Sequence, residues 1–297
     1  MNGCTPNRTY VRQPATIKRV SAADLLATAP PAGPDAGSPL VAVIGGLYLA
    51  VYLWRWISCR RDPKTRSPGV GRLIAFAAGC GLMALALGPP LDRWAEQSAT
   101  VHMVQHVVLL DLIPILLFAG LTKAMLRPIT KRLHGVEAKV GFLALPAFAV
   151  VAYCGLMYAW HVPALYNQAL KNSSVHALEH MTLLAAGILY WWHLMSPVRV
   201  RYHLAGTGPV LYMATTKILV GILGIVLIFS PSSLYAYTGS FMGMDPLTDQ
   251  HVAGTVMATE QTLVMGIAFA VLFLKMLADS ERRQLQEDVA AEAPSRA

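Results

Sequence analysis

The feature that most constrains this chain is a series of apolar blocks, each about 20 residues long. A helix rises about 1.5 Å per residue, so a block of this length crosses the roughly 30 Å hydrocarbon core of a bilayer. We therefore expect an all-α fold, a polytopic membrane bundle of about seven transmembrane helices. The predicted spans are residues 40–57, 73–90, 101–121, 140–160, 175–194, 210–229 and 252–277.

Composition excludes the soluble and nucleic-acid-binding classes. Of the 297 residues, 55% are hydrophobic and only 13% are charged, whereas about 25% are charged in an ordinary soluble domain. The net charge of +8 is spread over short clusters between the apolar blocks, which is how topology signals are distributed. We expect a lipid bilayer around the chain and no nucleic acid among its partners.

The two ends of the chain differ from its apolar middle. Residues 1–38 contain no apolar segment of the signal-peptide type and include a stretch rich in Ala, Pro and Gly at 27–39. Residues 278–297 are charged and Ala-rich. The expected organisation is a disordered N-terminal tail at 1–38, a seven-helix transmembrane domain at 39–277 and a charged cytoplasmic tail at 278–297.

Basic residues predict the orientation. Lysines and arginines crowd the loops that follow the first and third predicted spans, whereas the opposite loops offer only Arg93 and Lys171. Loops rich in Lys and Arg stay in the cytoplasm. We therefore expect the N-terminus outside, the C-terminus in the cytoplasm, and a multi-pass location in a bacterial plasma (inner) membrane.

Histidines gather at the ends of the spans on the outer side. His102 and His106 open the third predicted span, and His176 and His180 open the fifth. Residues four apart project from one helical face, so each pair can bind one metal ion. His161 ends the fourth span on the same side, where His251 begins the seventh.

We predict a metal site at these histidines. The predicted ligands are His102, His106, His161, His176 and His180, and additional ligands or orienting groups are His251, Met103, Met157 and Glu179. Imidazole suits copper, zinc, iron and nickel, and a nearby thioether favours Cu(I). Two alternatives stay open: interfacial histidines with no ligand, and haem held between one histidine of each pair.

Charged residues lie in the middle of three predicted spans. Asp111, Lys217 and Glu260 each fall roughly halfway along a span. Burying a charge in a bilayer costs at least about 2.5 kcal/mol, so these groups should face the bundle interior. Two interpretations remain open, a structural ion pair made by Lys217 and an intramembrane polar path for a proton or metal ion.

Three segments resemble a known family. They are GPPLDRWAEQSATVHMVQH at 88–106, WHVPALYNQAL followed by VHALEH within 160–180, and GMDPLTDQHVAG at 243–254. Together they resemble the CtaG family of caa-type cytochrome c oxidase assembly factors, over roughly residues 72–277. Asp92, Asp249 and Gln250 match further motif positions. The chain departs from the family pattern at Asp111, Pro114 and His251.

The resemblance implies a membrane factor that helps to mature a haem–copper cytochrome c oxidase in the respiratory chain. We expect a copper-binding metallochaperone rather than an enzyme, with copper as Cu(I), no haem, and cytochrome c oxidase subunits as partners. The alternative is a copper transporter in which the outer histidines capture the ion and the intramembrane charges conduct it.

Overall fold

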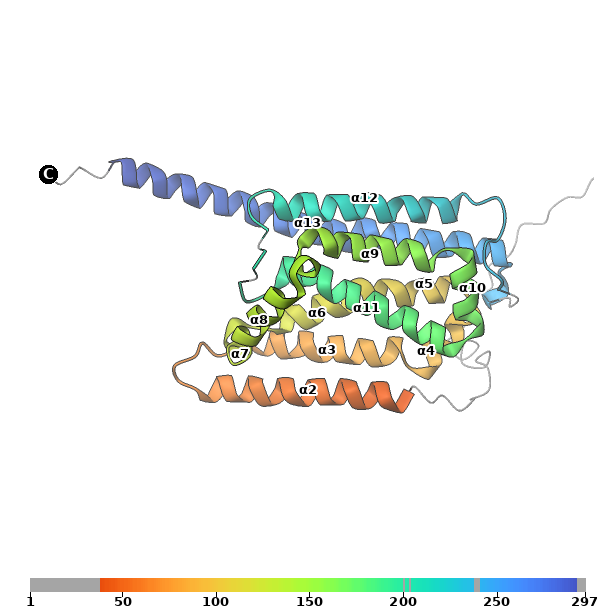
Figure 1. The fold of residues 1–297 in the computed structure, drawn as a ribbon, viewed down its shortest axis with the longest axis horizontal. Coiled ribbons are helices and arrows are strands. Elements are labelled where there is room, and N and C mark those ends of the chain that lie inside the picture. The colour runs from red at the N-terminus through yellow and green to blue at the C-terminus, as the bar shows by residue number, and fades with distance from the viewer. Residues whose placement is uncertain (1–37, 200, 203, 238–240, 293–297) are drawn as a thin grey trace, which may run out of the picture. The chain divides into compact units, whose positions relative to one another are not determined.

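The computed structural model describes the backbone of residues 38–199, 201–202, 204–237 and 241–292, which belong to one compact unit. Within these ranges all regular structure is helical (Figure 1). The longer helices are α2 (Ser38–Arg61), α3 (Val70–Ala86), α9 (Pro146–Trp160), α11 (Ser173–Met195), α12 (Gly208–Ile228) and α13 (Pro246–Glu292). A further continuous path consists of α5 (Ala99–Val107), the π-helical turn η1 (Val108–Leu112) and α6 (Ile113–Gly120). The short elements are α4 (Pro89–Ala95), α7 (Lys123–Leu126), α8 (Thr130–Val140), η2 (Gly141–Ala144), α10 (Pro163–Lys171) and η3 (Phe241–Gly243).

Each predicted span coincides with one of these helical paths, although prolines move two of the boundaries. α3 ends at Ala86, and Pro89 then starts α4, where the missing proline N–H costs no helical hydrogen bond. α9 begins at Pro146, several residues later than expected, and lies at 61° to the preceding helical segment. The prediction of an all-helical chain is confirmed for the described residues.

Three helical segments in the described part of the chain are long and apolar enough to cross a membrane. They are Ala99–Gly120, Gly208–Ile228 and Pro246–Val289, and the bent pair Thr130–Ala144 with Pro146–Trp160 is a fourth if it counts as one span. α3 is apolar but only 17 residues long. These segments identify a membrane protein with three to four clear spans.

The C-terminal segment differs from its prediction. We expected a charged tail from residue 278 that is separate from the last helix, but α13 continues to Glu292. Ala, Glu, Gln, Leu and Arg predominate in this segment, and all five favour helix. The next proline is Pro294, which disfavours helix at the residue before it. The predicted N-terminal tail at 1–38 lies almost wholly outside the described residues.

Glycines allow two close helix contacts that position the site. A Cβ on Gly187 of α11 would lie 2.2 Å from the carbonyl oxygen of Leu110 in η1. A Cβ on Gly254 of α13 would lie 2.9 Å from the carbonyl oxygen of Gly224 in α12. Real Cβ atoms do not come this close, so only glycine permits these approaches. The first contact holds α11 against the α5–η1–α6 path.

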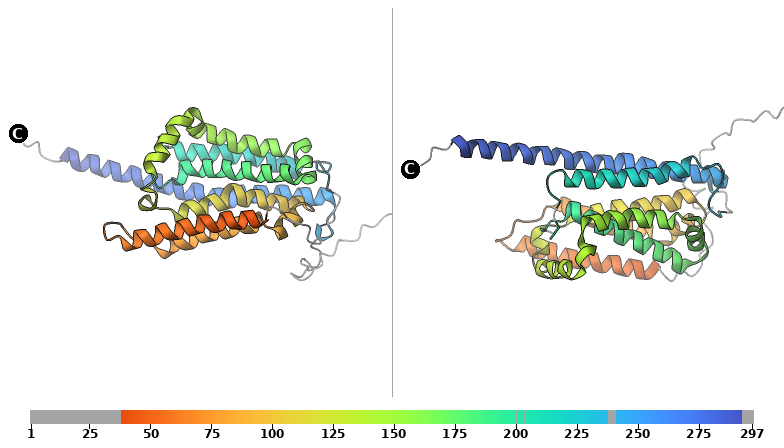
Figure 2. Two further views of the ribbon diagram at one scale, coloured as in Figure 1. Left: turned by 60° about the horizontal axis from the view of Figure 1, so that its bottom comes forward. Right: turned by 45° about the horizontal axis from the view of Figure 1, so that its top comes forward.

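The short helices lie at the two ends of the long ones. α4 and α10 lie at one end, together with the beginnings of α5, α11 and α13, whereas α7 and α8 lie at the other (Figures 1 and 2). α4 packs against α5, and α10 packs against α11. The end formed by α4 and α10 therefore surrounds the predicted metal ligands.

Candidate metal centre

α5 presents the first histidine pair, and its N-terminus is anchored by α13. Ser98 is the N-cap of α5. Asp249 accepts hydrogen bonds from the Ser98 hydroxyl at 2.9 Å, the Ala99 amide at 2.7 Å and the Thr100 amide at 3.1 Å. A carboxylate is favourable at this position because the first amides of a helix lack partners and carry partial positive charge. Asp249 therefore fixes the start of the helix that carries His102.

α11 presents the second pair together with Glu179. Asn172 caps this helix by accepting from the amides of Ser174 at 2.9 Å and Val175 at 3.3 Å. The i,i+4 spacing places His176 and His180 on one face, with ring centroids 4.2 Å apart. Both histidines and Glu179 are buried. The helix therefore turns three groups that can bind metal toward the bundle interior.

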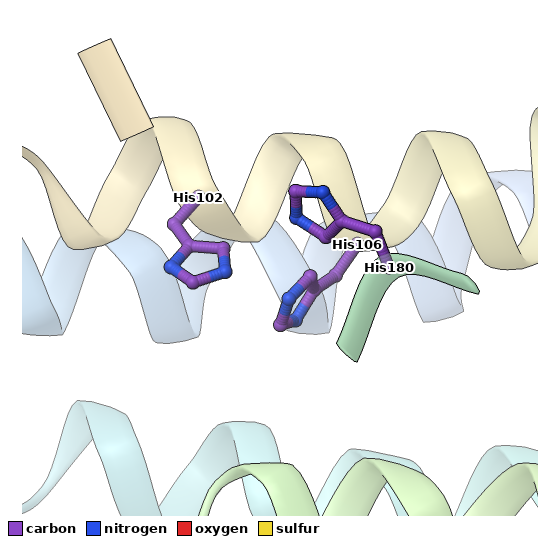
Figure 3. A group of neighbouring side chains, drawn as sticks. All are labelled: His102, His106 and His180. Carbon is purple, nitrogen blue, oxygen red and sulfur yellow. The ribbon is translucent and has the colours of Figure 1, made fainter. Parts of the chain in front are cut away.

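The two pairs converge on one another, as the sequence predicted. The ring of His102 lies 4.5 Å from that of His106, 5.0 Å from His176 and 5.7 Å from His180. Figure 3 shows His102 and His106 extending from one helix toward His180 of another. One ligand atom from each of these three residues lies within 4.8 Å of the others.

Hydrogen bonds to Tyr237 define the tautomer of His102. The Tyr237 hydroxyl donates to the Ala95 carbonyl at 3.3 Å. Its single proton is thus used, so it accepts from Nδ1–H of His102 at 3.2 Å and from the Tyr166 hydroxyl at 2.8 Å. Burial raises the pKa of Tyr166 and Tyr237 well above the usual tyrosine value, so both hydroxyls keep their protons. The Nε2 atom of His102 is left with a free lone pair.

Glu179 faces the Nε2 atoms of His102 and His106 without a hydrogen bond to either. One carboxylate oxygen lies 3.4 Å from Nε2 of His102, and the other lies 3.2 Å from Nε2 of His106. All three side chains are fully buried, and these four atoms make no hydrogen bond. At His102, whose proton is on Nδ1, a buried lone pair thus faces a buried carboxylate oxygen, which is costly unless a cation lies between them. The geometry therefore fits a bound metal ion.

His161 adds a donor from a third helix. It is the C-cap of α9, and its Nδ1 lies 2.7 Å from the Met157 carbonyl, which accepts the Nδ1 proton. The Nε2 atom is buried and unpaired. Its ring lies 5.7 Å from that of His106. A backbone carbonyl on one ring nitrogen is the usual way of orienting a metal-binding imidazole.

Asp92 of α4 supplies an oxygen at the rim of the cluster. Its carboxylate lies 3.8 Å from Nδ1 of His176, and its side chain is 38% exposed whereas that of His176 is only 7% exposed. Gln105 holds this region by donating to the Ala86 carbonyl at 2.7 Å and to Asp92 at 3.3 Å. Asp92, His176 and His180 form a second group with ligand atoms within 4.8 Å of one another.

His251 lies outside these groups, and the two predicted methionines pack in the apolar core. The Nε2 atom of His251 contacts the Ser230 carbonyl at 3.0 Å, and among the described residues it belongs to none of the metal-binding groups. Met103 and Met157 are buried in the apolar core cluster. The additional role that we predicted for His251 therefore has no support from its position.

The intramembrane charged residues form their hydrogen bonds with groups other than those expected. Asp111, in η1, accepts from the Tyr153 hydroxyl at 2.6 Å and from the Trp191 indole at 2.8 Å. Its carboxyl group also interacts with that of Glu260. Lys217 donates to the Gln261 carbonyl at 2.6 Å, and no salt bridge of Lys217 occurs within the described ranges. The charge of Lys217 still acts on Glu260, so within these ranges Lys217 attracts that carboxyl group without reaching salt-bridge distance, and both interpretations of the three charges stay predictions.

Sequence reasoning missed two kinds of contributor. It named Asp92 as a motif position of the resembled family but assigned it no ligand role, since a single acidic residue in a short helix carries no spacing signal. It did not select Tyr166 and Tyr237, which lie on α10 and in a loop and contact each other and His102 only through the tertiary fold.

The helical spans define a membrane protein, and its buried cluster of histidines and carboxylates is a candidate metal centre. Comparison with known families agrees with this class. The model of the cytochrome c oxidase caa3 assembly factor family matches residues 50–279. The chain belongs to this family.

Curated relatives are more distant and much longer. An uncharacterized protein of Mycobacterium leprae is 22% identical over 265 residues, which are 80% of this chain and 38% of that protein. An uncharacterized protein of Mycobacterium bovis is 26% identical over 165 residues, which are 50% of this chain and 25% of that protein. This chain thus spans well under half the length of these relatives. No solved structure matches.

Proposed function

We propose that this protein assists the assembly of a haem–copper cytochrome c oxidase by binding copper at its buried histidine cluster and passing it to an oxidase subunit. The observation that carries the proposal is the set of unpaired buried nitrogens on His102, His106, His161, His176 and His180. The family description supplies the assembly role. The protein acts as a metallochaperone, without a catalytic reaction of its own.

The choice of copper rests on the donor set together with the family description. Five imidazoles and two carboxylates suit copper, zinc, iron or nickel. Copper is our choice among them because the family assists a cytochrome c oxidase, which we expect to be of the haem–copper class. We propose Cu(I) as the transferred ion. Asp92 is the exposed group at the rim, so we propose that copper enters and leaves there.

Copper analysis of the purified protein tests the site. The double variant His102→Ala and His176→Ala removes one nitrogen donor from each helix, and we expect copper binding to fall at least tenfold in affinity. His251→Ala is the matched control because that ring lies on a carbonyl outside the cluster. Equal affinity and stoichiometry in the double variant and the control would show that the histidines are not the ligands.

A deletion strain tests the assembly role. Loss of cytochrome c oxidase activity, restored by the wild-type chain but not by the double histidine variant, is the expected result. Normal oxidase activity and copper content in the deletion strain would contradict the proposal. Absence of a Soret band in the purified protein separates copper binding from the haem alternative.

We also propose that α2, α3, α9, α11 and the three clearly apolar paths all cross a bacterial inner membrane, with the N-terminus and the histidine end outside. The basic residues of α7 and α8, such as Lys123 and Lys131, lie at the opposite end from α4 and α10 (Figure 1), in line with a cytoplasmic location. The orientation can be tested with Lys131→Cys and Lys171→Cys, each made in a chain whose own cysteines have been replaced. Labelling by an impermeant reagent added outside should occur at Lys171 only.

Copper transport is the second candidate function. It is favoured by Asp111 and Glu260, whose neighbouring buried carboxyl groups lie further along the α5–η1–α6 path and α13 than the starts of these paths, where the histidine cluster lies. In proteoliposomes, copper flux that is lost in Glu260→Gln would support transport. Copper binding without flux would support assembly.

A further inference from the structure

The cluster offers more donors than one metal ion uses. Its three groups contain His102, His106, His176, His180, Asp92 and Glu179, and His161 adds another buried unpaired nitrogen beside His106. A single ion in a site of this kind takes about four protein ligands. Seven donors therefore exceed the needs of one ion.

The donors also divide in space. Ligand atoms of one ion lie close together, because each is only about 2.0–2.2 Å from the metal. Asp92 groups with His176 and His180, whereas His106 groups with His102 and His180. Among the described residues no group joins Asp92 to His106, and the ring of His161 contacts that of His106. The cluster thus has a rim side, with Asp92 and His176, and an inner side, with His106 and His161.

Glu179 and His180 occupy the positions between the two sides. His180 belongs to both the rim group and the inner group. Glu179 groups with His102 and His176, and its other oxygen lies 3.2 Å from Nε2 of His106. A buried carboxylate with both oxygens free of hydrogen bonds can bind one ion through each oxygen.

The charges are consistent with two ions as well. The cluster contains two carboxylates, Asp92 and Glu179, among neutral imidazole donors. Two monovalent cations would equal these two negative charges, of which Glu179 is fully buried and Asp92 is 38% exposed at the rim.

We propose that the cluster binds two copper ions side by side, one at the rim and one inside, with Glu179 between them. The inference rests on the proposed copper-binding function and assigns it a stoichiometry. The rim ion is held by Asp92 and His176, and the inner ion by His106 and His161, with His102 and His180 between the two sides. Copper would then pass from the inner position to the exposed rim position before release.

Metal counting tests the proposal on the full-length protein. The chain is loaded anaerobically with Cu(I), washed with a weak chelator, and analysed for copper per chain. We expect two ions in the wild type, one in Asp92→Asn with His176→Asn, one in His106→Asn with His161→Asn, and two in the control His251→Ala. Gel filtration checks that each variant is folded.

Spectroscopy of the wild type gives a readout that needs no variant. In a sample loaded with Cu(II), two neighbouring ions are magnetically coupled and give a half-field EPR signal, which an isolated ion lacks. One copper per wild-type chain without this signal would overturn the two-ion site and leave the proposed function standing. No bound copper would overturn both and would identify the cluster as a proton-stabilised network.

Discussion

Removal of the Asp249 carboxylate should destabilise the helix that carries His102 and His106. Replacing an N-cap residue by alanine costs about 1 kcal/mol and up to about 2 kcal/mol in proteins. Asp249 is 3% exposed and serves the amides of Ala99 and Thr100 as well as the Ser98 hydroxyl. Its loss leaves buried donors without an acceptor, which costs about 1–3 kcal/mol of folding free energy. We expect Asp249→Ala to lower the free energy of unfolding by about 3 kcal/mol, and Asp249→Asn, which keeps one acceptor oxygen, by about half as much.

The assay is denaturant unfolding in detergent after treatment with a chelator, so that bound metal does not contribute to stability. Asp245→Ala is the matched control, because Asp245 caps the start of α13 through the amides of Leu247 and Thr248 but is exposed. Copper affinity should fall with Asp249→Ala, since the first histidine pair is no longer held in place. A loss of stability no larger than that of Asp245→Ala would refute the anchoring role.

Three further predictions concern packing, the buried carboxyl group and pH. Gly187→Ala should lower the free energy of unfolding by about 3 kcal/mol or more, because its methyl group would meet the Leu110 carbonyl. Gly155→Ala should be close to neutral, since nothing lies within 4 Å of a Cβ at that position. Thermal unfolding in detergent compares the two variants. Tyr153→Phe should cost about 1–3 kcal/mol by removing a donor to Asp111, while copper per chain, measured in parallel, should not change. Copper should be released only as the pH falls below about 6.5, the ordinary histidine value, because protons compete for the imidazole lone pairs while burial and bound metal both oppose protonation; a copper affinity that does not change between about pH 7 and pH 4 would argue against histidine ligation.

The periodic parts of this fold were predictable from sequence, and the reasons are local. Apolar blocks of spanning length specify helices whatever surrounds them, and the pairs His102 with His106 and His176 with His180 share a helical face because of their i,i+4 spacing. Their convergence followed from placing both helix starts on one side of the bundle. These inferences use only the geometry of a single helix and the alternation of loops.

The remaining features depend on tertiary contacts that no local pattern encodes. Charge alone offered Lys217 as a partner for Asp111 or Glu260, whereas Tyr153 and Trp191 supply the hydrogen bonds of the Asp111 carboxylate. His251 has the same residue type and lies near the same end of the bundle as the ligands, but the helix directs its ring to Ser230. The tyrosine that orients His102 comes from a loop far away in sequence. The direction of a side chain across an interface decides each of these cases.

The π-helical turn η1 has a consequence for how insertions and deletions act on this protein. A π turn accommodates one residue more than an α-helical turn, and η1 follows His106 and contains Asp111. Deleting one residue from 108–110 would restore regular α-helix and rotate Asp111 and everything beyond it by about a quarter turn relative to the histidines. The histidines would keep their positions while Asp111 turned away from Tyr153 and Trp191. The metal cluster and the carboxyl pair are thus separable by a change of chain length, without any substitution in either.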